Sequence, residues 1–358
     1  MSKSTRKSVV VIGGGASGAT ITRVLSAKLN PNTTTLTLVT ARPFAVHLPG
    51  AIRMTTTAEG KLEESVLIPY DSLLVNNNGT IKVGRVTAIE PAKESNAGGS
   101  VVLSTGERIQ YHILVLAPGS EWSGPLALPD DRAAVLEHIR SWRRKFENAS
   151  GIILAGGGAV GCEYAGEVKD AYPRKKVTIV HSDSQLLNAA YPNKYRKLVE
   201  KDVTARGVNI VFNDYLDGDL VVPTYGSRPG TGFVKSLGSS VLTPRGLIKV
   251  EPTLQVKSHP NIYAIGDVID WEEQKQAAKA PKHAQIAAAN IIAQLSGGTP
   301  KKTYTGQPEL IIITNGKKYG ISYVGMLWGI TLGNWFSSMM KGKELMVSMT
   351  RKGYGLAK

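Results

Sequence analysis

The chain is short of cysteine, of long apolar runs and of acidic residues. Its 358 residues include one cysteine, Cys162, which excludes an intramolecular disulfide framework, a structural zinc cluster and a CxxC redox centre. No run of about 18 apolar residues is present, so no transmembrane helix is predicted. The short basic segment 1–8 leads straight into an apolar stretch, and Ser2 follows the initiator Met, so we expect neither a signal peptide nor a myristoyl anchor. These absences predict a cytoplasmic protein.

The shortage of acidic residues makes the chain strongly basic. It has 43 basic and 28 acidic residues, and its formal net charge is +15. A basic surface attracts nucleotides, anionic membranes and nucleic acid, and charge alone does not choose among them. The 38 glycines follow no Gly-X-Y period, which places them in turns and ligand loops.

Two stretches of the chain share the order strand, glycine-rich turn, helix, strand. The first joins apolar residues 9–12 to the turn Gly13-Gly14-Gly15-Ala16-Ser17-Gly18, and a second strand follows at 35–39. The second joins residues 151–155 to the turn Gly156-Gly157-Gly158-Ala159-Val160-Gly161, and a strand follows at 176–180. They lie too far apart to be repeats of a solenoid, so they indicate two separate nucleotide-binding domains.

Each glycine of such a fingerprint has a physical reason. Gly13 allows the tight turn, Gly15 lets a pyrophosphate approach the backbone, and Gly18 lets the helix pack against the strand. The free N–H groups at the start of the helix then face the phosphates. One such motif is weak evidence, but two in the right context predict two dinucleotides. We expect a flavin that stays bound and a nicotinamide dinucleotide that comes and goes.

In these motifs and their order, the sequence resembles the two-dinucleotide-binding-domain flavoproteins. The motifs that carry the resemblance are Gly13–Gly18, Ala117-Pro118-Gly119, Gly156–Gly161, Thr224–Pro229 and Gly266-Asp267. Within these proteins the chain looks most like the subgroup of ferroptosis suppressor protein 1, also called apoptosis-inducing-factor-homologous mitochondrion-associated inducer of death. The stretches most similar to that subgroup are His47–Arg53, Val177–Ser182, Asn261–Asp267 and His283–Ile291.

The resemblance implies an α/β fold with two Rossmann-like dinucleotide-binding domains, of the glutathione reductase type, and a C-terminal α+β segment. The expected FAD-binding domain is discontinuous and covers residues 1–135 and 245–300. The expected NAD(P)H-binding domain covers residues 136–244, and the C-terminal segment covers residues 301–358.

The resemblance also implies roles for single residues. Asp267 would bind the ribityl chain of FAD or its adjoining phosphate, Arg53 would lie near FAD, and Val86 would contact the adenine through its backbone. Glu163 and Lys275 match positions where the flavin meets the nicotinamide, and they are the expected catalytic residues. The expected cofactor-binding residues in the turns are Gly13, Gly14, Gly15, Ala16, Ser17, Gly18, Ala117, Gly119, Gly156, Gly158 and Gly161.

Three positions depart from the family's pattern. Thr40 ends the second strand, where an acid usually binds the adenosine ribose, and His181 stands at the equivalent place in the second unit. Both are expected cofactor-binding residues. Because His181 is neither the acid that favours NADH nor the arginine that favours NADPH, the preference between NADH and NADPH stays open. Ala117-Pro118-Gly119 replaces the Ala-Thr-Gly turn common in the family.

The expected function is that of an FAD-dependent NAD(P)H oxidoreductase with a quinone-like electron acceptor. A single cysteine cannot form a thiol relay, so electrons must pass directly from flavin to acceptor. Two alternatives stay open. One is a reductase of an acidic electron-transfer protein, and the other is a non-enzymatic DNA-binding protein similar to apoptosis-inducing factor. No nucleic-acid-binding motif and no metal site is visible, so neither a specific nucleic acid nor a metal is expected.

The C-terminal segment suggests contact with a membrane surface. A candidate hydrophobic mouth over the flavin is formed by Gly325–Ile330, Trp335 and Phe336. The basic residues nearby are candidate contacts with anionic lipid: Lys341, Lys343, Arg351 and Lys352. A quinone dissolved in the bilayer would then reach the site without the chain spanning the membrane.

The second nucleotide-binding unit lacks a segment that the first one has. A β-meander is expected in the flavin half across Thr80–Val115. In the second half only residues 213–219 separate the strands at 207–212 and 220–223. At about 3.3 Å per residue this connection is too short to hold extra strands. We therefore expect a truncated sheet with an exposed edge.

Overall fold

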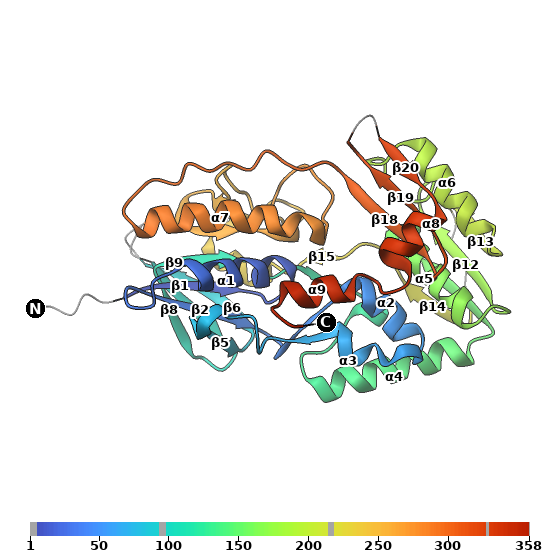
Figure 1. The fold of residues 1–358 in the computed structure, drawn as a ribbon, viewed down its shortest axis with the longest axis horizontal. Helices are drawn as coiled ribbons and strands as arrows, with labels where there is room; N and C mark the ends of the chain where they lie inside the picture. Colours follow the sequence, from blue (N-terminus) through green and yellow to red (C-terminus); the bar gives the residue numbers. More distant parts are fainter. Residues whose placement is uncertain (1–5, 93–97, 214–217, 327–328, 358) are drawn as a thin grey trace, which may run out of the picture.

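The first glycine-rich unit forms the centre of a six-stranded sheet (Figure 1). The computed structural model describes residues 6–92, 98–213, 218–326 and 329–357. β1 (Lys7–Ile12) is buried from Val9 to Ile12 and pairs in parallel with β2 (Thr34–Thr40) and β9 (Ile113–Leu116). The full strand order is β16 (Gln255–Val256), β17 (His259–Ala264), β9, β1, β2 and β5 (Thr80–Val83). Because its central strands are apolar on both faces, this sheet needs a covering layer on each side.

Helices and a meander supply those two layers. α1 (Ala16–Lys28) and α7 (Ala280–Leu295) pack against each other on one side of the sheet (Figure 1). The antiparallel strands β6 (Val86–Pro91), β7 (Gly99–Leu103) and β8 (Arg108–Tyr111) lie on the other side. The meander is therefore shorter than the predicted range 80–115, because strands 80–83 and 113–116 both belong to the central sheet.

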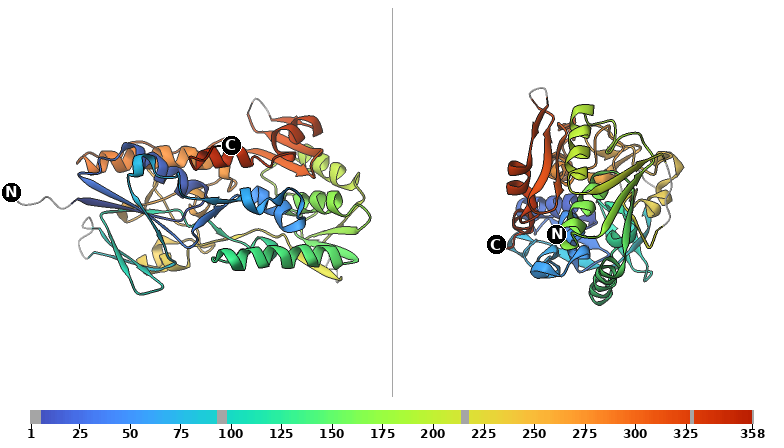
Figure 2. Two further views of the ribbon diagram at one scale, coloured as in Figure 1. Left: turned by 60° about the horizontal axis from the view of Figure 1, so that its bottom comes forward. Right: turned by 90° about the vertical axis from the view of Figure 1, so that its right-hand side faces the viewer.

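The second glycine-rich unit forms a four-stranded parallel sheet. Its order is β13 (Val208–Phe212), β12 (Lys176–His181), β11 (Gly151–Ala155) and β14 (Leu220–Pro223). α4 (Arg132–Asn148), α5 (Ala159–Ala171) and α6 (Asn193–Thr204) bury apolar faces in the core around it. The two main sheets lie one after the other along the long axis of the molecule (Figure 2). The predicted α/β fold with two Rossmann-like units is confirmed.

The C-terminal segment adds an α+β layer, as predicted. β18 (Leu310–Asn315), β19 (Tyr319–Val324) and β20 (Ile330–Leu332) form an antiparallel sheet that packs on α5 and α6. α8 (Asn334–Ser337), a π-helical turn (Ser338–Gly342) and α9 (Val347–Gly353) follow. Gly166 of α5 lies so close to Gly316 that a Cβ there would overlap the Gly316 backbone. The sheet and the helix therefore meet backbone to backbone.

Among the described residues, no helix has the length and hydropathy needed to cross a bilayer. Shorter elements complete the fold. The remaining strands and α-helices are β3 (Phe44–Val46), α2 (Leu48–Thr56), α3 (Glu63–Val66), β4 (Leu67–Pro69), β10 (Ser120–Glu121) and β15 (Arg228–Pro229). The 3₁₀ turns are Glu59–Lys61, Val75–Asn77, Gly124–Leu126, Gly232–Leu237, Ser239–Val241, Gly266–Val268 and Ala277–Lys279.

Candidate functional site

The first fingerprint turn joins β1 to α1 and is tightly packed on one side only. Gly13 has φ +99°, and a Cβ on Gly13 would overlap the carbonyl group of Ala117. A Cβ on Gly18 would overlap the carbonyl oxygen of Gly13. By contrast, no atom of the described residues lies within 4 Å of a Cβ built on Gly15. The turn is therefore closed toward the sheet and open at Gly15, where a pyrophosphate would approach.

The start of α1 suits an anion. No side chain caps the helix at Gly15, and its first turn, which begins with Ala16 and Ser17, holds no acidic residue. Such a terminus offers free N–H groups and the positive end of the helix dipole. On the far side of the turn, the hydroxyls of Tyr70 and Tyr354 each donate to the carbonyl oxygen of Gly14, at 3.1 Å. The chain's last helix thus reaches the first fingerprint, which the sequence analysis missed.

The Gly266-Asp267 motif lies beside this turn. Gly266 has φ +80°, and a Cβ there would overlap the side chain of Ser17. Asp267 Oδ2 accepts a hydrogen bond from the hydroxyl of Ser120 at 2.8 Å. Ser120 directly follows Gly119, whose φ is +72° and beside which there is also open space. Three motifs that are distant in the chain therefore converge at the carboxyl ends of β1, β9 and β17.

The predicted adenosine end lies at the carboxyl end of β2. Thr40 is buried, and its hydroxyl donates to the carbonyl oxygen of Arg42 at 3.2 Å. Val86 opens β6 and is half-buried. A cavity of about 240 Å³ lies nearby and is lined by Tyr70, Leu74, Ile81 and Val83, among others. Its position matches the end of the sheet where the adenosine half of FAD is expected, and the contacts of Thr40 and Val86 with FAD stay predictions.

The second fingerprint repeats the geometry of the first. Gly156 has φ +127°, and a Cβ on it would come within 2.6 Å of the Tyr225 backbone nitrogen. A Cβ on Gly161 would overlap the carbonyl oxygen of Gly156, while Gly158 faces open space. No side chain caps α5 at Gly158, and its first turn also lacks an acidic residue. These backbone groups fit a second pyrophosphate.

His181 is the last residue of β12, and its hydrogen bonding determines which ring nitrogen carries the proton. Its Nδ1 accepts a hydrogen bond from the Gly157 N–H at 3.2 Å, so the ring proton lies on Nε2. Nε2 is buried and has no hydrogen-bond partner among the described residues. A free N–H donor thus stands where an acid usually binds the ribose, and it fits a ribose hydroxyl or a 2′-phosphate. The preference between NADH and NADPH stays open.

Glu163 lies in the second turn of α5, and the C-terminal segment contacts it. Glu163 Oε1 accepts hydrogen bonds from the backbone N–H and the hydroxyl of Thr314, both at 3.1 Å, and pairs with Lys341 Nζ. Lys341 also donates to the carbonyl oxygen of Ile312 at 3.1 Å. Its side chain is 12% exposed, so the expectation that Lys341 faces lipid is wrong. No local pattern could have found this pair, whose members are 178 positions apart.

Lys275 follows the Gly266-Asp267 motif by one short loop. Its side chain is exposed, and Nζ donates to the carbonyl oxygens of Ile269 at 2.8 Å and Trp271 at 3.0 Å. Among the described residues, no hydrogen bond or ion pair joins Lys275 to Glu163. The structure therefore does not place the two predicted catalytic residues in direct contact with each other, and their joint role stays a prediction.

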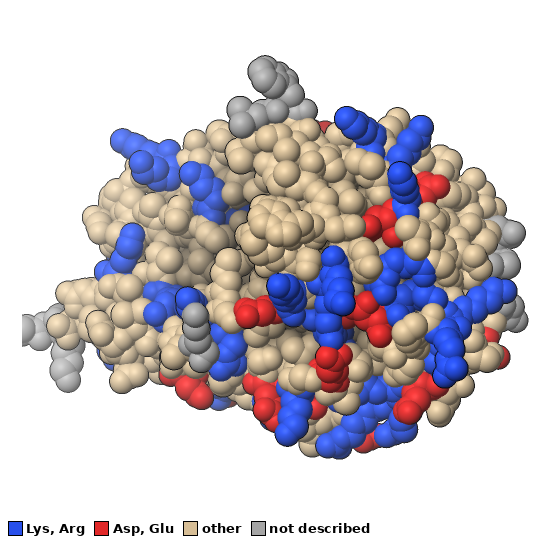
Figure 3. All heavy atoms as spheres, turned by 45° about the vertical axis from the view of Figure 1, so that its right-hand side comes forward, with Lys and Arg blue, Asp and Glu red and all other residues tan. Residues whose placement is uncertain are grey.

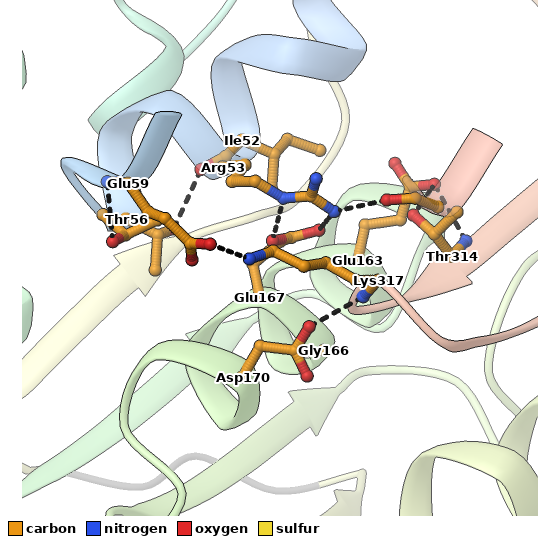
Figure 4. A network of polar contacts seen from close by, with 12 residues as sticks. Ile52, Arg53, Thr56, Glu59, Glu163, Gly166, Glu167, Asp170, Thr314 and Lys317 are labelled. Atoms are coloured by element: carbon orange, nitrogen blue, oxygen red, sulfur yellow. Dashed lines mark hydrogen bonds and ion pairs between the residues drawn. The ribbon is translucent and has the colours of Figure 1, made fainter. Parts of the chain in front are cut away.

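Arg53 lies where three parts of the chain meet (Figure 4). Its guanidinium forms two hydrogen bonds with Glu167 of α5, at 2.6 and 2.8 Å. It also donates to the carbonyl oxygens of Gly342 at 2.7 Å and Lys343 at 3.1 Å. Both side chains of the pair are almost fully buried. Arg53 thus joins α2 to α5 and to the C-terminal segment, while its predicted contact with FAD stays untested.

Comparison with known proteins agrees with this geometry. The family model for pyridine nucleotide-disulphide oxidoreductases matches residues 7–216 and 213–290. The FAD-dependent oxidoreductase FVFD30 of Flammulina velutipes is 41% identical over 324 residues, which cover 85% of this chain and all of that protein. Human ferroptosis suppressor protein 1 is 26% identical over 371 residues, which cover 96% of this chain and 95% of that protein. The resemblance seen in the motifs is therefore confirmed.

Solved structures share the fold. The sulfide:quinone oxidoreductase of Aquifex aeolicus superposes with a TM-score of 0.77 at 17% identity, covering 97% of this chain and 92% of that one. Putidaredoxin reductase, in its covalent complex with putidaredoxin, gives a TM-score of 0.69 at 21% identity, covering 89% and 81%. The two open fingerprint turns fit the two dinucleotides that such enzymes use, FAD and NADH or NADPH. The chain belongs to the pyridine nucleotide-disulphide oxidoreductase family and is an FAD-dependent oxidoreductase.

Proposed function

We propose that this enzyme transfers electrons from NADH or NADPH, through FAD, to a quinone-like acceptor. The observation that carries the proposal is the state of the only cysteine. Cys162 is fully buried, and burial, reinforced by the neighbouring charge of Glu163, raises the pKa of its thiol to about 12. Such a thiol is neither a nucleophile nor half of a redox pair. The acceptor must therefore take electrons directly from the flavin, which suits a small organic oxidant.

The chain's own residues would prepare the meeting place of the two cofactors. FAD, when bound, accepts a hydride from NAD(P)H and passes its electrons on. Glu163, which follows the second fingerprint, is held by Thr314 and Lys341, so its carboxylate has a fixed orientation. Lys275 is anchored to two carbonyl groups close after Asp267. We assign both to positioning the nicotinamide against the flavin.

The C-terminal segment offers an apolar surface for an apolar acceptor. Trp335 is 77% exposed, and Met339, Met340 and Met349 are also exposed. Lys343 and Lys352 lie exposed in the same segment. Leu327 and Trp328, part of the predicted hydrophobic mouth, lie outside the described residues. On the face drawn in Figure 3, lysine and arginine are densest over the lower right, and further groups of them lie at the upper left and upper right, on either side of a middle part with few charged side chains. An apolar patch flanked by bases suits an anionic membrane that holds the quinone.

Anaerobic reduction and reoxidation test the acceptor. The purified holoenzyme is reduced with NADH and, separately, with NADPH, and reoxidation is then followed with menadione, ubiquinone analogues, ferricyanide and an acidic ferredoxin. We expect rapid reoxidation by the quinones. Reoxidation by the ferredoxin alone would instead support the reductase of an acidic electron-transfer protein.

Flotation with liposomes tests the membrane contact. We expect the wild-type enzyme to float with anionic vesicles at low salt and to be released as the ionic strength rises, because charge attraction is screened. The double variant Trp335→Ser/Met339→Ser should stay behind. Val221→Ser serves as the matched control, since Val221 is 44% exposed on β14, away from the C-terminal segment. Equal flotation of all three proteins, or none of the wild type, contradicts the membrane contact.

A further inference from the structure

A group of buried charged side chains lies beside the Gly266-Asp267 turn, and no sequence motif assigned a role to any of them. Lys279 Nζ lies 2.7 Å from Glu309 Oε1 and 3.5 Å from Glu273 Oε2. The Tyr304 hydroxyl donates to Glu273 Oε2 at 2.5 Å. The side chains of Glu273 and Lys279 are each 4% exposed. Burying charges is costly unless each one is paired, so this arrangement calls for a reason.

His283 connects this group to the turn. Its ring is 1% exposed, and Nδ1 accepts a hydrogen bond from the backbone N–H of Gly266 at 3.1 Å. Nε2, on the other side of the ring, lies 3.3 Å from Glu273 Oε1. This distance is an ion-pair contact: Nε2 makes no hydrogen bond of normal geometry with any described residue, and the Glu273 carboxylate is the charged group that faces it. Because Nδ1 accepts the Gly266 N–H in this structure, Nδ1 carries no proton, and the ring proton lies on Nε2, facing the carboxylate.

Glu273 is suited to enforce that tautomer. Burial acts to raise the pKa of its carboxyl group, but the contacts with His283, Tyr304 and Lys279 outweigh burial and hold the pKa below its ordinary value. An ionised carboxylate only accepts hydrogen bonds, so the His283 proton is kept on the side of Glu273. Nδ1 is then always free to receive the Gly266 N–H. The group that faces Nε2 thus determines whether Nδ1 can accept a hydrogen bond.

We propose that Glu273 and His283 are positioning residues of the flavin site, which fix the Gly266-Asp267 turn through the Gly266 N–H. Gly266 sits at a positive φ next to Ser17, and because glycine has access to many backbone conformations, a hydrogen bond to its N–H helps to select this one. With the N–H fixed, the carboxylate of Asp267 stays beside Ser120 and the first fingerprint. The inference rests on Asp267 as a ligand of FAD and is independent of the electron acceptor.

Two substitutions at His283 separate hydrogen bonding from packing. His283→Asn keeps an acceptor near the position of Nδ1, whereas His283→Phe keeps an aromatic ring that can pack against Tyr304, whose centroid lies 4.4 Å from that of His283. Release of FAD from the purified holoenzyme is followed by the rise in flavin fluorescence. We expect release from the Phe variant to be about 5- to 100-fold faster than from wild type, because a buried N–H loses its partner, and release from the Asn variant to be nearly normal. Wild-type release from the Phe variant, or equal acceleration in both variants, overturns the proposal.

The tautomer itself gives a second, structural readout. In ¹⁵N NMR of the imidazoles, the His283 resonances are identified as those lost in His283→Asn. They should show a protonated Nε2 and an unprotonated Nδ1. Glu273→Leu should shift them toward a mixture of tautomers and speed FAD release, whereas Glu272→Gln, a change at the exposed neighbouring glutamate, should do neither. A Glu273→Leu variant with unchanged resonances refutes the positioning role.

The variant Asp267→Ala separates this inference from its premise. If Asp267→Ala holds FAD as well as wild type while the His283 tautomer depends on Glu273, the assignment of Asp267 to FAD fails and the proposed purpose of the pair falls with it. If Asp267→Ala loses FAD and the His283 variants behave as expected, both stand.

Discussion

At the scale of single residues, Asp267 is the side chain on which flavin binding depends most directly. Asp267→Ala removes a carboxylate that lies beside the first fingerprint and accepts from Ser120. Loss of a charge-assisted hydrogen bond to a buried hydroxyl or phosphate costs about 1.5–3 kcal/mol. We expect the variant to purify with little flavin and to rebind it weakly. Asp270→Ala, at an exposed acid in the same loop, is the control and should keep its full flavin content.

Glu163 and Lys275 are predicted to act on the rate of flavin reduction rather than on flavin binding. Glu163→Ala or Lys275→Ala should slow reduction by NAD(P)H about tenfold or more, since small misplacements of reacting groups are costly. The flavin absorption spectrum should remain nearly unchanged. Stopped-flow measurement of the reduction rate checks this, with Lys282→Ala as a control at an exposed lysine. Wild-type rates in both variants would remove these residues from the mechanism.

At the scale of elements, α5 carries an acidic stripe that organises the C-terminal segment. Glu163, Glu167 and Asp170 fall about one turn apart on the same face, as spacings of three and four residues require. Their partners come from three different segments: Lys341, Arg53 and Arg206. Asp170 also accepts from the backbone N–H of Lys317 at 2.7 Å, and Lys317 Nζ pairs with Glu59 (Figure 4). The helix that follows the nicotinamide fingerprint is thereby tied to the strands that cover it.

The sheet of the second unit is predicted to open before the sheet of the first. Its strand β14 is an edge strand, Val221 on it is 44% exposed, and residues 213–219 are too few to form a covering meander. Regions with a thin covering layer open at a lower free-energy cost. Hydrogen exchange should therefore be faster in 151–222 than in the central strands of the first sheet. Uniform protection across both sheets would contradict this.

At the scale of the whole molecule, the Arg53–Glu167 pair lies inside the core that surrounds the second sheet, where it joins α2 to α5. Removing one partner leaves an unpaired buried charge, which typically costs about 3–5 kcal/mol. We expect Arg53→Met to lower the free energy of unfolding by about that amount. The double variant Arg53→Met/Glu167→Met should lose less than Arg53→Met alone, because no buried charge is left unpaired. Urea unfolding of both variants measures this, and a double variant no more stable than Arg53→Met would be the contrary result.

The C-terminal segment spans the molecule from one cofactor half to the other. β18 lies against α5 of the nicotinamide half, and Tyr354 reaches the Gly14 carbonyl of the flavin half. Between them, His47 Nε2 contacts the carbonyl oxygen of Leu345 at 2.6 Å, and Arg53 binds the carbonyls of Gly342 and Lys343. This segment therefore belongs to both halves and is placed to fix their relative position.

The sequence by itself determined what rests on local chemistry. The roles of Gly13, Gly15 and Gly18 follow from the turn that they form, and buried strands such as residues 9–12 follow from unbroken apolar runs. The role of Asp267 beside the flavin, by contrast, was implied only by the resemblance to the family, because no local pattern tells which strands lie next to each other.

Only the tertiary structure decided which charges pair. The packing of helices and strands determines three pairs: Glu163 with Lys341, Arg53 with Glu167, and Glu273 with His283. In the first two pairs the partners are more than 100 positions apart. A charged residue in a sequence carries no sign of its distant partner, and most charged residues are solvated. Lys341 illustrates this, since its sequence neighbourhood suggested lipid contact while packing placed it on Glu163. Burial made these pairs specific, and burial is a property of the folded chain alone.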